Sequence, residues 1–208
     1  MTRFDLADLE HPVIQAPMGG GPSNPVLAAA VSGAGGLGFL AAGYKTAEAV
    51  RAEIHDLRAR TDRPFGVNVF VPSEATDPAV VERYADTLRG EVERYGTALG
   101  ESRHDDDGWE EKLALVAEEQ VPVVSFAFGC PSAGAIEALQ RAGSAVWVTV
   151  TSAAEAAEAV AAGADALVVQ GAEAGGHRGS FADREDLPVH GLRALRRHHS
   201  SPLPFRCL

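Results

Sequence analysis

The sequence predicts an α/β fold, and within that class an incomplete (β/α)8 barrel with about six βα units. Apolar runs alternate with helical stretches along the chain, and Ala, Gly and Val are abundant while aromatic residues make up only 6%. The segments "QRAGSAVWV" and "VAAGADALVV" repeat one pattern of helix end, glycine and strand. Repeated βα units of this length indicate a parallel sheet with buried strands. A complete doubly wound sheet is the alternative architecture.

The first part of the chain is predicted to contain three strands, each an apolar run that ends at a loop. Asn24 is expected to cap the first helix, with Pro25 as its first residue. The residue pattern predicts a second helix over residues 46–60. The three strands are expected at residues 12–18, 37–43 and 64–72.

A polar, helix-prone stretch over residues 76–119 follows the third strand. We interpret it as an insertion followed by the next helix. The run "HDDDG" at residues 104–108 interrupts it and is expected to be a solvated acidic loop. A metal site in this run is the less favoured alternative.

The second part of the chain repeats a shorter unit. Ser152 and Glu155 have the spacing of a capping box at a helix start, and Gly143 and Gly163 stand where helices are expected to end. Strands are expected at residues 121–129, 144–150 and 164–171, and helices at residues 132–142 and 152–162.

Small and polar residues stand at the predicted C-terminal ends of five strands and, as Asn68, inside the third, and this spread toward one rim favours the barrel. Catalytic residues of (β/α)8 barrels lie on the loops that follow these strand ends. The residues concerned are 16–18, Gly43, Asn68, 129–131, 149–151 and 170–178.

Composition excludes several classes of function. With 18 basic and 29 acidic residues the formal net charge is −11, which argues against a general nucleic-acid or anionic-membrane binder. No apolar run is long enough to span a membrane, and the acidic N-terminal segment lacks the features of a signal peptide. Two cysteines do not form a disulfide framework. We expect a cytoplasmic protein that acts on small molecules, with a homo-oligomer as one arrangement.

The stretch "QGAEAGGHRGSF", residues 170–181, is the strongest candidate site. Its glycines allow a close backbone approach, and backbone N–H groups in such a loop can bind an anion or the edge of a flat cofactor. Gln170 ends an apolar run and needs hydrogen-bond partners, which a cofactor would supply. The alternative is a glycine-rich connection with a solvated His177.

Three further residues have two interpretations each. Asn68 interrupts a strand, either because it contacts a ligand or because its amide bonds to neighbouring backbone. Met18 alone fits a core position better than a ligand contact. Cys130 has no base beside it in sequence, which favours a structural thiol over a nucleophile.

The segments "QAPMGGGPSNPVLAAAVSGAGGLGFLAAGY", "PFGVNVFVP", "VVSFAFGCP" and "QGAEAGGHRGSF" together resemble the nitronate monooxygenase family, formerly called 2-nitropropane dioxygenases. The resemblance runs over most of the chain, from about His11 to about Pro188, and its "QGAEAGGHRG" segment is the most discriminating. It implies an FMN-dependent TIM barrel in which His177 matches the proposed catalytic base. The residues that match flavin contacts are Ala16, Pro17, Met18, Asn68, Gln170, Gly175 and Gly176.

The function that this resemblance implies is the oxidation of alkyl nitronates, and of nitroalkanes, with O2. Imidazole can accept a proton near neutral pH from a carbon next to a nitro group, and the flavin carries the redox step. Two alternatives stay open: a related FMN- and NAD(P)H-dependent reductase of enoyl-acyl carrier protein type, and a truncated, inactive product that cannot hold flavin.

The end of the sequence departs from the family pattern. Two further βα units would be expected, with the loops that hold the FMN phosphate, and we divide the chain into a partial barrel domain over residues 1–186 and an atypical basic tail over 187–208. The tail has four arginines and no acidic residue. A shifted reading frame would produce such an ending, and a genuine basic tail is the alternative.

Overall fold

The computed structural model describes residues 3–182 and 187–198 and contains one five-stranded parallel sheet. The strands lie in the order β1-β2-β3-β4-β5, so each pairs with the next one along the chain. An order without reversal is that of a partial (β/α)8 barrel and differs from that of a doubly wound sheet. The strands are β1 Gly38–Ala41, β2 Phe65–Phe70, β3 Val123–Ala127, β4 Ala145–Val150 and β5 Ala166–Val169.

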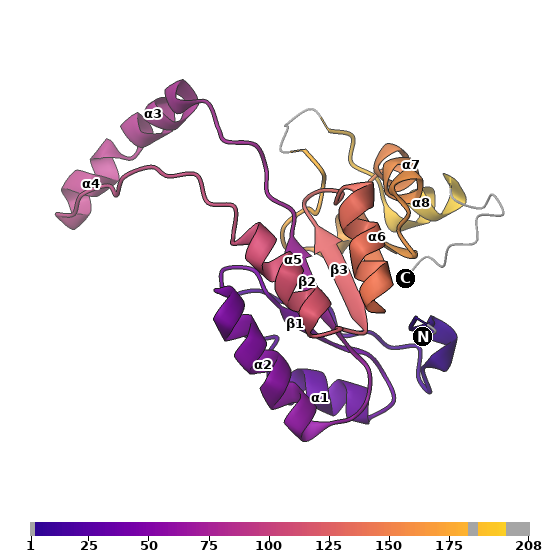
Figure 1. The fold of residues 1–208 in the computed structure, drawn as a ribbon. Coiled ribbons are helices and arrows are strands. Elements are labelled where there is room, and N and C mark those ends of the chain that lie inside the picture. The colour runs from indigo at the N-terminus through magenta and orange to yellow at the C-terminus, as the bar shows by residue number, and fades with distance from the viewer. Residues whose placement is uncertain (1–2, 183–186, 199–208) are drawn as a thin grey trace.

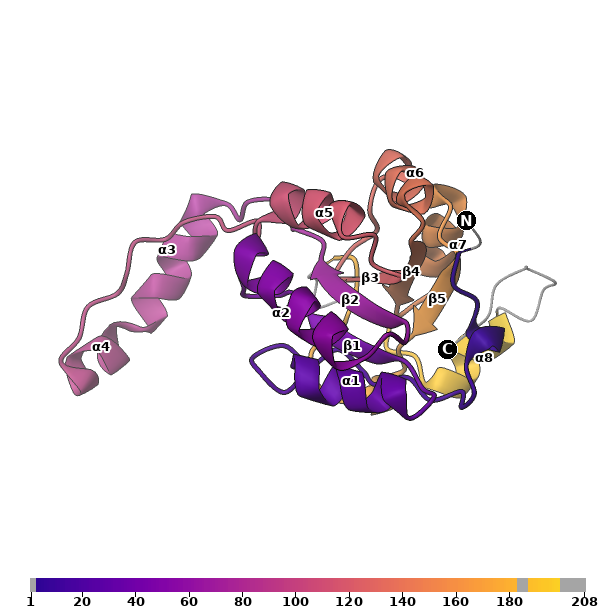
Figure 2. The same cartoon turned by 60° about the horizontal axis from the view of Figure 1, so that its bottom comes forward.

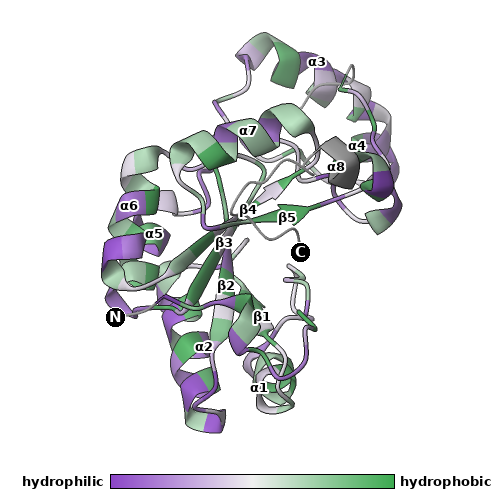
Figure 3. Cartoon of the chain, turned by 90° about the vertical axis from the view of Figure 1, so that its right-hand side faces the viewer, coloured by the Kyte–Doolittle hydropathy of each residue, from purple (hydrophilic) through white to green (hydrophobic). Residues whose placement is uncertain are grey.

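Helices line the outer face of the curved sheet, as Figures 1 and 3 show. The outward-facing residues Leu40, Val67 and Phe126 are fully buried beneath them. Burying such a side chain contributes about 1.5–3 kcal/mol, so the layer is held mainly by apolar contact. The helices of this layer are α1 Pro25–Gly33, α2 Ala47–Arg60, α5 Trp109–Glu118, α6 Ala133–Ala142 and α7 Ala153–Ala162.

The caps predicted for these helices are mostly confirmed. The Asn24 side chain accepts a hydrogen bond from the N–H of Leu27, and Gly143 and Gly163 end their helices with φ of 104° and 99°. The capping box predicted for α7 is only half formed. The Ser152 hydroxyl accepts from the N–H of Glu155, but the Glu155 carboxylate bonds elsewhere.

The first predicted strand, residues 12–18, is not a strand in the structure. It meets β1 at a single isolated bridge between Ile14 and Leu37. The amide oxygen of Gln15 accepts the N–H of Phe39 at 2.9 Å, a donor that the next rung of a parallel ladder would use. A side chain therefore replaces the backbone acceptor, and the segment continues as an extended loop.

The insertion predicted after the third strand is confirmed as an arm that leaves the body of the protein between β2 and β3 (Figures 1 and 2). It carries helices α3 Pro78–Thr87 and α4 Arg89–Tyr95, and no residue of either helix is buried.

The acidic loop at the end of this arm is not wholly solvated, which corrects the sequence prediction. Oδ2 of Asp107 lies 2.7 Å from Nζ of Lys112, whose side chain is only 1% exposed. Oδ1 of the same carboxylate accepts the N–H of Tyr44, just after β1. The loop thus supplies the counter-ion for a buried lysine, because a buried ammonium without a partner is costly.

The C-terminal part of the described chain contains the short helices η2 Ala172–Ala174 and α8 Leu192–His198. Leu195 is buried and packs with Val148 and Leu167 in the core cluster beside β4 and β5. The end of the predicted basic tail, with Arg206 and Cys207, lies outside the described residues, and the domain boundary at 186 stays a prediction. Within residues 3–182 and 187–198, no helix is long and apolar enough to cross a membrane.

Candidate functional site

The inner face of the sheet borders an open cavity of about 750 Å³. Alternate residues of four strands point into it, because side chains of a strand alternate between faces. The N-terminal segment lines part of its other side. Its lining is mostly apolar and contains two hydroxyl groups, those of Ser125 and Thr149. The lining residues are Leu6, Pro12, Ile14, Ala16, Pro17, Phe39, Ser125, Trp147, Thr149 and Val168.

The structure brings Ala16 and Pro17 to this cavity, whereas Met18 is 40% exposed. The buried hydroxyl of Ser23 organises the loop that follows. It accepts hydrogen bonds from the N–H of Met18 at 2.8 Å and from Nε2 of Gln15 at 2.7 Å. Small, rigid side chains at the cavity wall leave room for a flat ligand to approach the backbone.

Asn68 lies on the same face of the sheet, with only 4% of its surface exposed. Its Nδ2 donates to Oγ of Ser125 at 2.9 Å and to the Ser125 carbonyl at 3.2 Å. Ser125 is its register partner on β3 and lines the cavity. The structure therefore contains the backbone bond expected of the purely structural alternative, and it also places Asn68 beside the cavity wall through Ser125.

Gln170 holds the loop that follows β5. Its Nε2 donates to the carbonyl of His177 at 3.1 Å, and its Oε1 accepts the N–H of Gly179 at 2.7 Å. The sequence suggested that a cofactor would satisfy this amide, but both of its ends bond to the loop itself. Gly175 and Gly176 have φ of 71° and 67°, which favours glycine at both positions.

The His177 loop borders a second, smaller cavity of about 160 Å³, lined in part by Gln170, Gly175 and Gly176. The His177 side chain is exposed and lines neither of these two cavities. Gly179 lies against Thr149, since a Cβ at Gly179 would be 3.0 Å from Cγ2 of Thr149. Thr149 lines the larger cavity, so the loop and the inner face of the sheet meet at the end of β4.

Sequence reasoning missed an aromatic row at the same edge of the sheet. The rings of Tyr44 and Phe70 are 5.5 Å apart and those of Phe70 and Phe128 are 4.8 Å apart, both edge to face. The absence of a side chain at Gly43 makes room for Phe70, because a Cβ there would be 2.2 Å from its ring. The glycine at position 43 is the sequence feature that could have indicated a large side chain packed against the end of β1.

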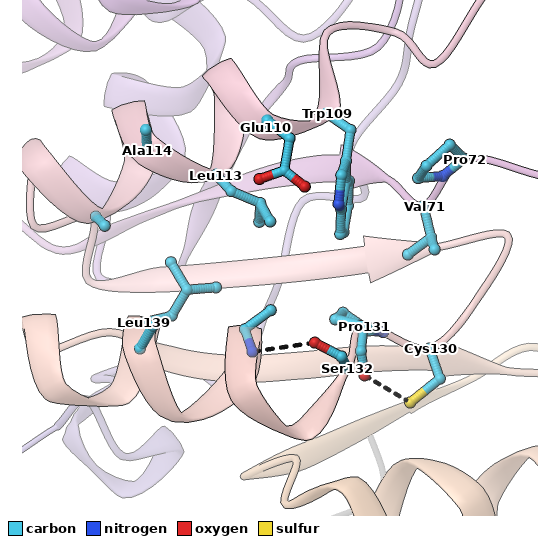
Figure 4. Close-up of a pocket in the computed structure, with 13 residues that line it drawn as sticks. Val71, Pro72, Trp109, Glu110, Leu113, Ala114, Cys130, Pro131, Ser132 and Leu139 are labelled. Carbon is cyan, nitrogen blue, oxygen red and sulfur yellow. Dashed lines mark hydrogen bonds between the residues drawn. The ribbon is translucent and has the colours of Figure 1, made fainter.

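Cys130 lies apart from these residues, at a groove of about 590 Å³ between α5 and α6 on the outer face. Figure 4 shows Trp109 and Leu113 on one side of this groove and Leu139 and Cys130 on the other. Burial raises the pKa of the Cys130 thiol to about 11, and the charge of Glu158 adds to the rise. A thiol that stays protonated is a poor nucleophile, as expected for a structural cysteine.

Comparison with known proteins decides the family. The family model described as nitronate monooxygenase matches residues 2–197 of the chain. The chain belongs to the nitronate monooxygenase family.

Curated members of the nitronate monooxygenase family are similar over most of this chain. The nitronate monooxygenase of Paraburkholderia phytofirmans is 44% identical over 185 residues, which cover 85% of this chain and 49% of the relative. That of Pseudomonas aeruginosa is 42% identical over 201 residues, covering 92% and 56%. The chain therefore spans about half the length of these relatives.

Solved structures agree with the family and with the barrel. A nitroalkane oxidase from Streptomyces ansochromogenes superposes with a TM-score of 0.87 at 47% identity, covering 97% of this chain and 59% of that one. FabK from Thermotoga maritima superposes with a TM-score of 0.65 at 29% identity, covering 97% and 51%. The predicted membership and the predicted α/β barrel class are both confirmed.

Proposed function

We propose that the protein is an FMN-dependent oxidoreductase that oxidises alkyl nitronates with O2, and nitroalkanes after their deprotonation. The observation that carries the proposal is that Ala16, Pro17 and Ser125, the partner of Asn68, line one cavity, and that the Gln170–Gly179 loop contacts the wall of this cavity at Thr149, near the C-terminal edge of the sheet. Active sites of (β/α)8 barrels lie at this edge. Family membership supplies the reaction class.

The inner-face cavity suits the ring system of FMN. Its volume of about 750 Å³ is within the range of ligand pockets, and its apolar wall is interrupted by the hydroxyls of Ser125 and Thr149. Ala16, Pro17 and Asn68, together with the Gly175–Gly176 backbone, would hold the flavin. When bound, the flavin would supply the redox chemistry that links oxidation of the nitronate to reduction of O2.

The chain's own contribution would be to bind, orient and deprotonate the substrate. We propose His177 as the base that removes the proton from the carbon next to the nitro group. Neutral imidazole is suited to that task near neutral pH. Gln170 holds the His177 backbone carbonyl, which restricts where the imidazole can reach. An anionic nitronate needs no such base, so only the neutral substrate depends on this step.

The first experiment is a visible absorbance spectrum of the purified chain, before and after incubation with FMN and desalting. The proposal requires a retained flavin spectrum, followed by O2 consumption with alkyl nitronates. A well-folded protein that retains no flavin would favour the non-catalytic alternative.

A reductase of enoyl thioesters is the second candidate, because the chain also superposes on FabK. Rapid NAD(P)H oxidation with an enoyl thioester, and no nitronate oxidation, would favour it. The higher TM-score and identity of the nitroalkane oxidase match support the first proposal. The cytoplasmic location and the homo-oligomer stay predictions.

A further inference from the structure

Glu155, in the first turn of α7, uses its carboxylate in an unusual way. In a capping box the N3 side chain would accept the N–H of the N-cap residue, here Ser152. Instead, Oε2 of Glu155 accepts the N–H of Thr151 at 2.6 Å and the Thr151 hydroxyl at 2.9 Å. Oε1 accepts the N–H of Phe181 at 3.1 Å.

These donors come from two different places in the barrel. Thr151 follows the end of β4, and Phe181 closes the loop after β5, four residues beyond His177. Phe181 also packs against the core cluster beside β4 and β5. Glu155 therefore ties the far end of the His177 loop to the neighbouring strand.

Gln170 holds the same loop from its other side, through the carbonyl of His177 and the N–H of Gly179. The backbone between His177 and Phe181 is thus bonded to a side chain at three points. Glycine-rich backbone has high conformational freedom, so fixing it requires such contacts. Hydrogen bonds to a carboxylate are stronger than those between neutral groups.

We propose that Glu155 is a positioning residue that fixes the loop carrying His177. Glu155 lines neither of the two cavities described above, and it acts by holding Phe181 in place. This inference rests on the proposed function for the role of His177. Small displacements of a catalytic group can lower a rate by about 10²-fold, which sets the size of the expected effect.

The test compares Glu155→Gln with Glu158→Gln in the full chain. Both substitutions remove one negative charge from α7, but Glu158 makes no hydrogen bond to the Thr151–Phe181 region among those found in the described chain. A glutamine at 155 has one acceptor oxygen, so either Thr151 or Phe181 loses its partner. Glu155→Asp is the second variant, because it keeps the charge but is too short to reach both sides.

The first readout is native-state cleavage by trypsin after Arg178, with the products identified by mass spectrometry. Loss of one charge-assisted bond should raise the rate of this cleavage about tenfold in both Glu155 variants. Glu158→Gln should match the wild type. Equal cleavage in all four proteins would overturn the proposal, whatever reaction the protein catalyses.

The second readout is turnover of neutral nitroalkanes against preformed nitronates. For the Glu155 variants, kcat with nitroalkanes should fall about 10²-fold, while kcat and KM with nitronates should change less than about threefold. Equal losses on both substrates would overturn a role through His177. If the wild type oxidises no nitronate, the proposed function fails and the cleavage rates alone decide whether Glu155 fixes the loop.

Discussion

The amide of Asn68 on β2 donates hydrogen bonds to both the hydroxyl and the carbonyl of Ser125, its register partner on β3. The amide N–H groups of this polar residue, which interrupts an apolar strand, are thereby hydrogen-bonded to the next strand. The pair lies on the inner face of the sheet, where Ser125 lines the large cavity. One contact thus stabilises the β2–β3 pairing and shapes the cavity wall.

Replacing Asn68 by Ala should destabilise the fold by about 1–3 kcal/mol, since it removes two buried hydrogen bonds and leaves Ser125 with fewer partners. Urea unfolding followed by circular dichroism measures the change. Asn24→Ala, which removes only an exposed helix cap, should cost about 1 kcal/mol. A larger loss for Asn24 than for Asn68 would contradict this account.

Replacing His177 by Asn should abolish turnover of neutral nitroalkanes and spare preformed nitronates. The imidazole is needed only to remove a proton, and its loss should lower kcat on nitroalkanes by about 10²–10⁴-fold. O2 consumption with both substrates, at one pH, measures the difference. Equal loss on both would instead give His177 a role in binding the anion.

Sequence patterns located β1 to β5 and the helix caps because the signals are local. Apolar runs mark strands that are buried on both faces, and Asn24 and Gly143 mark helix ends. The prediction of a strand at residues 12–18 was wrong because the Gln15 side chain accepts the backbone N–H of Phe39, which a strand ladder would otherwise use. Such competition depends on three-dimensional geometry.

The site was only partly predictable for a related reason. Asn68 stood out as a misplaced polar residue, but its partner Ser125 is 57 residues away and depends on strand register. Glu155 matched a capping box, whereas its bond to Phe181 spans 26 residues. The capping-box spacing correctly singled out Glu155, but it predicted the wrong hydrogen-bond partner for the Glu155 carboxylate.

Replacing Gly38 by Ala should destabilise the protein by about 3 kcal/mol, because the added Cβ would be 2.0 Å from the carbonyl oxygen of Ala28 in α1. The control is Gly33→Ala at the end of α1, where no atom outside the local helix backbone lies within 4 Å of the added Cβ. This change should be neutral or should stabilise by about 0.5–1 kcal/mol. Thermal unfolding of both variants tests the pair, and similar Tm values would refute the close packing of α1 on β1.

Replacing Asp107 by Asn should cost about 3–5 kcal/mol, because it leaves the buried Lys112 ammonium without its counter-charge. Lys112→Met should cost less, about 1–2 kcal/mol, since the Asp107 side chain is 21% exposed and its Oδ1 still accepts the N–H of Tyr44. Equilibrium unfolding of the two variants measures the asymmetry. Equal costs would contradict the asymmetry expected of a buried ammonium beside a partly exposed carboxylate.

Alkylation of Cys130 by iodoacetamide should be about 100-fold slower in the folded protein than in the unfolded chain at pH 8. Only the thiolate reacts, and the pKa raised to about 11 by burial keeps the thiol protonated at that pH. The rate should therefore increase as the pH rises toward 11. Peptide mass spectrometry at several pH values measures it, and fast modification at pH 8 would contradict the burial.

The arm between β2 and β3 has a consequence for how this fold can vary. It enters after Phe70 and returns before Val123, and the register from Gly66↔Val123 to Phe70↔Ala127 is continuous across it. The entropy of closing a loop grows only slowly with its length. Residues can therefore be gained or lost in α3 and α4 without shifting Asn68 from Ser125, so the arm can change in length while the β2–β3 pairing and the cavity wall stay in place.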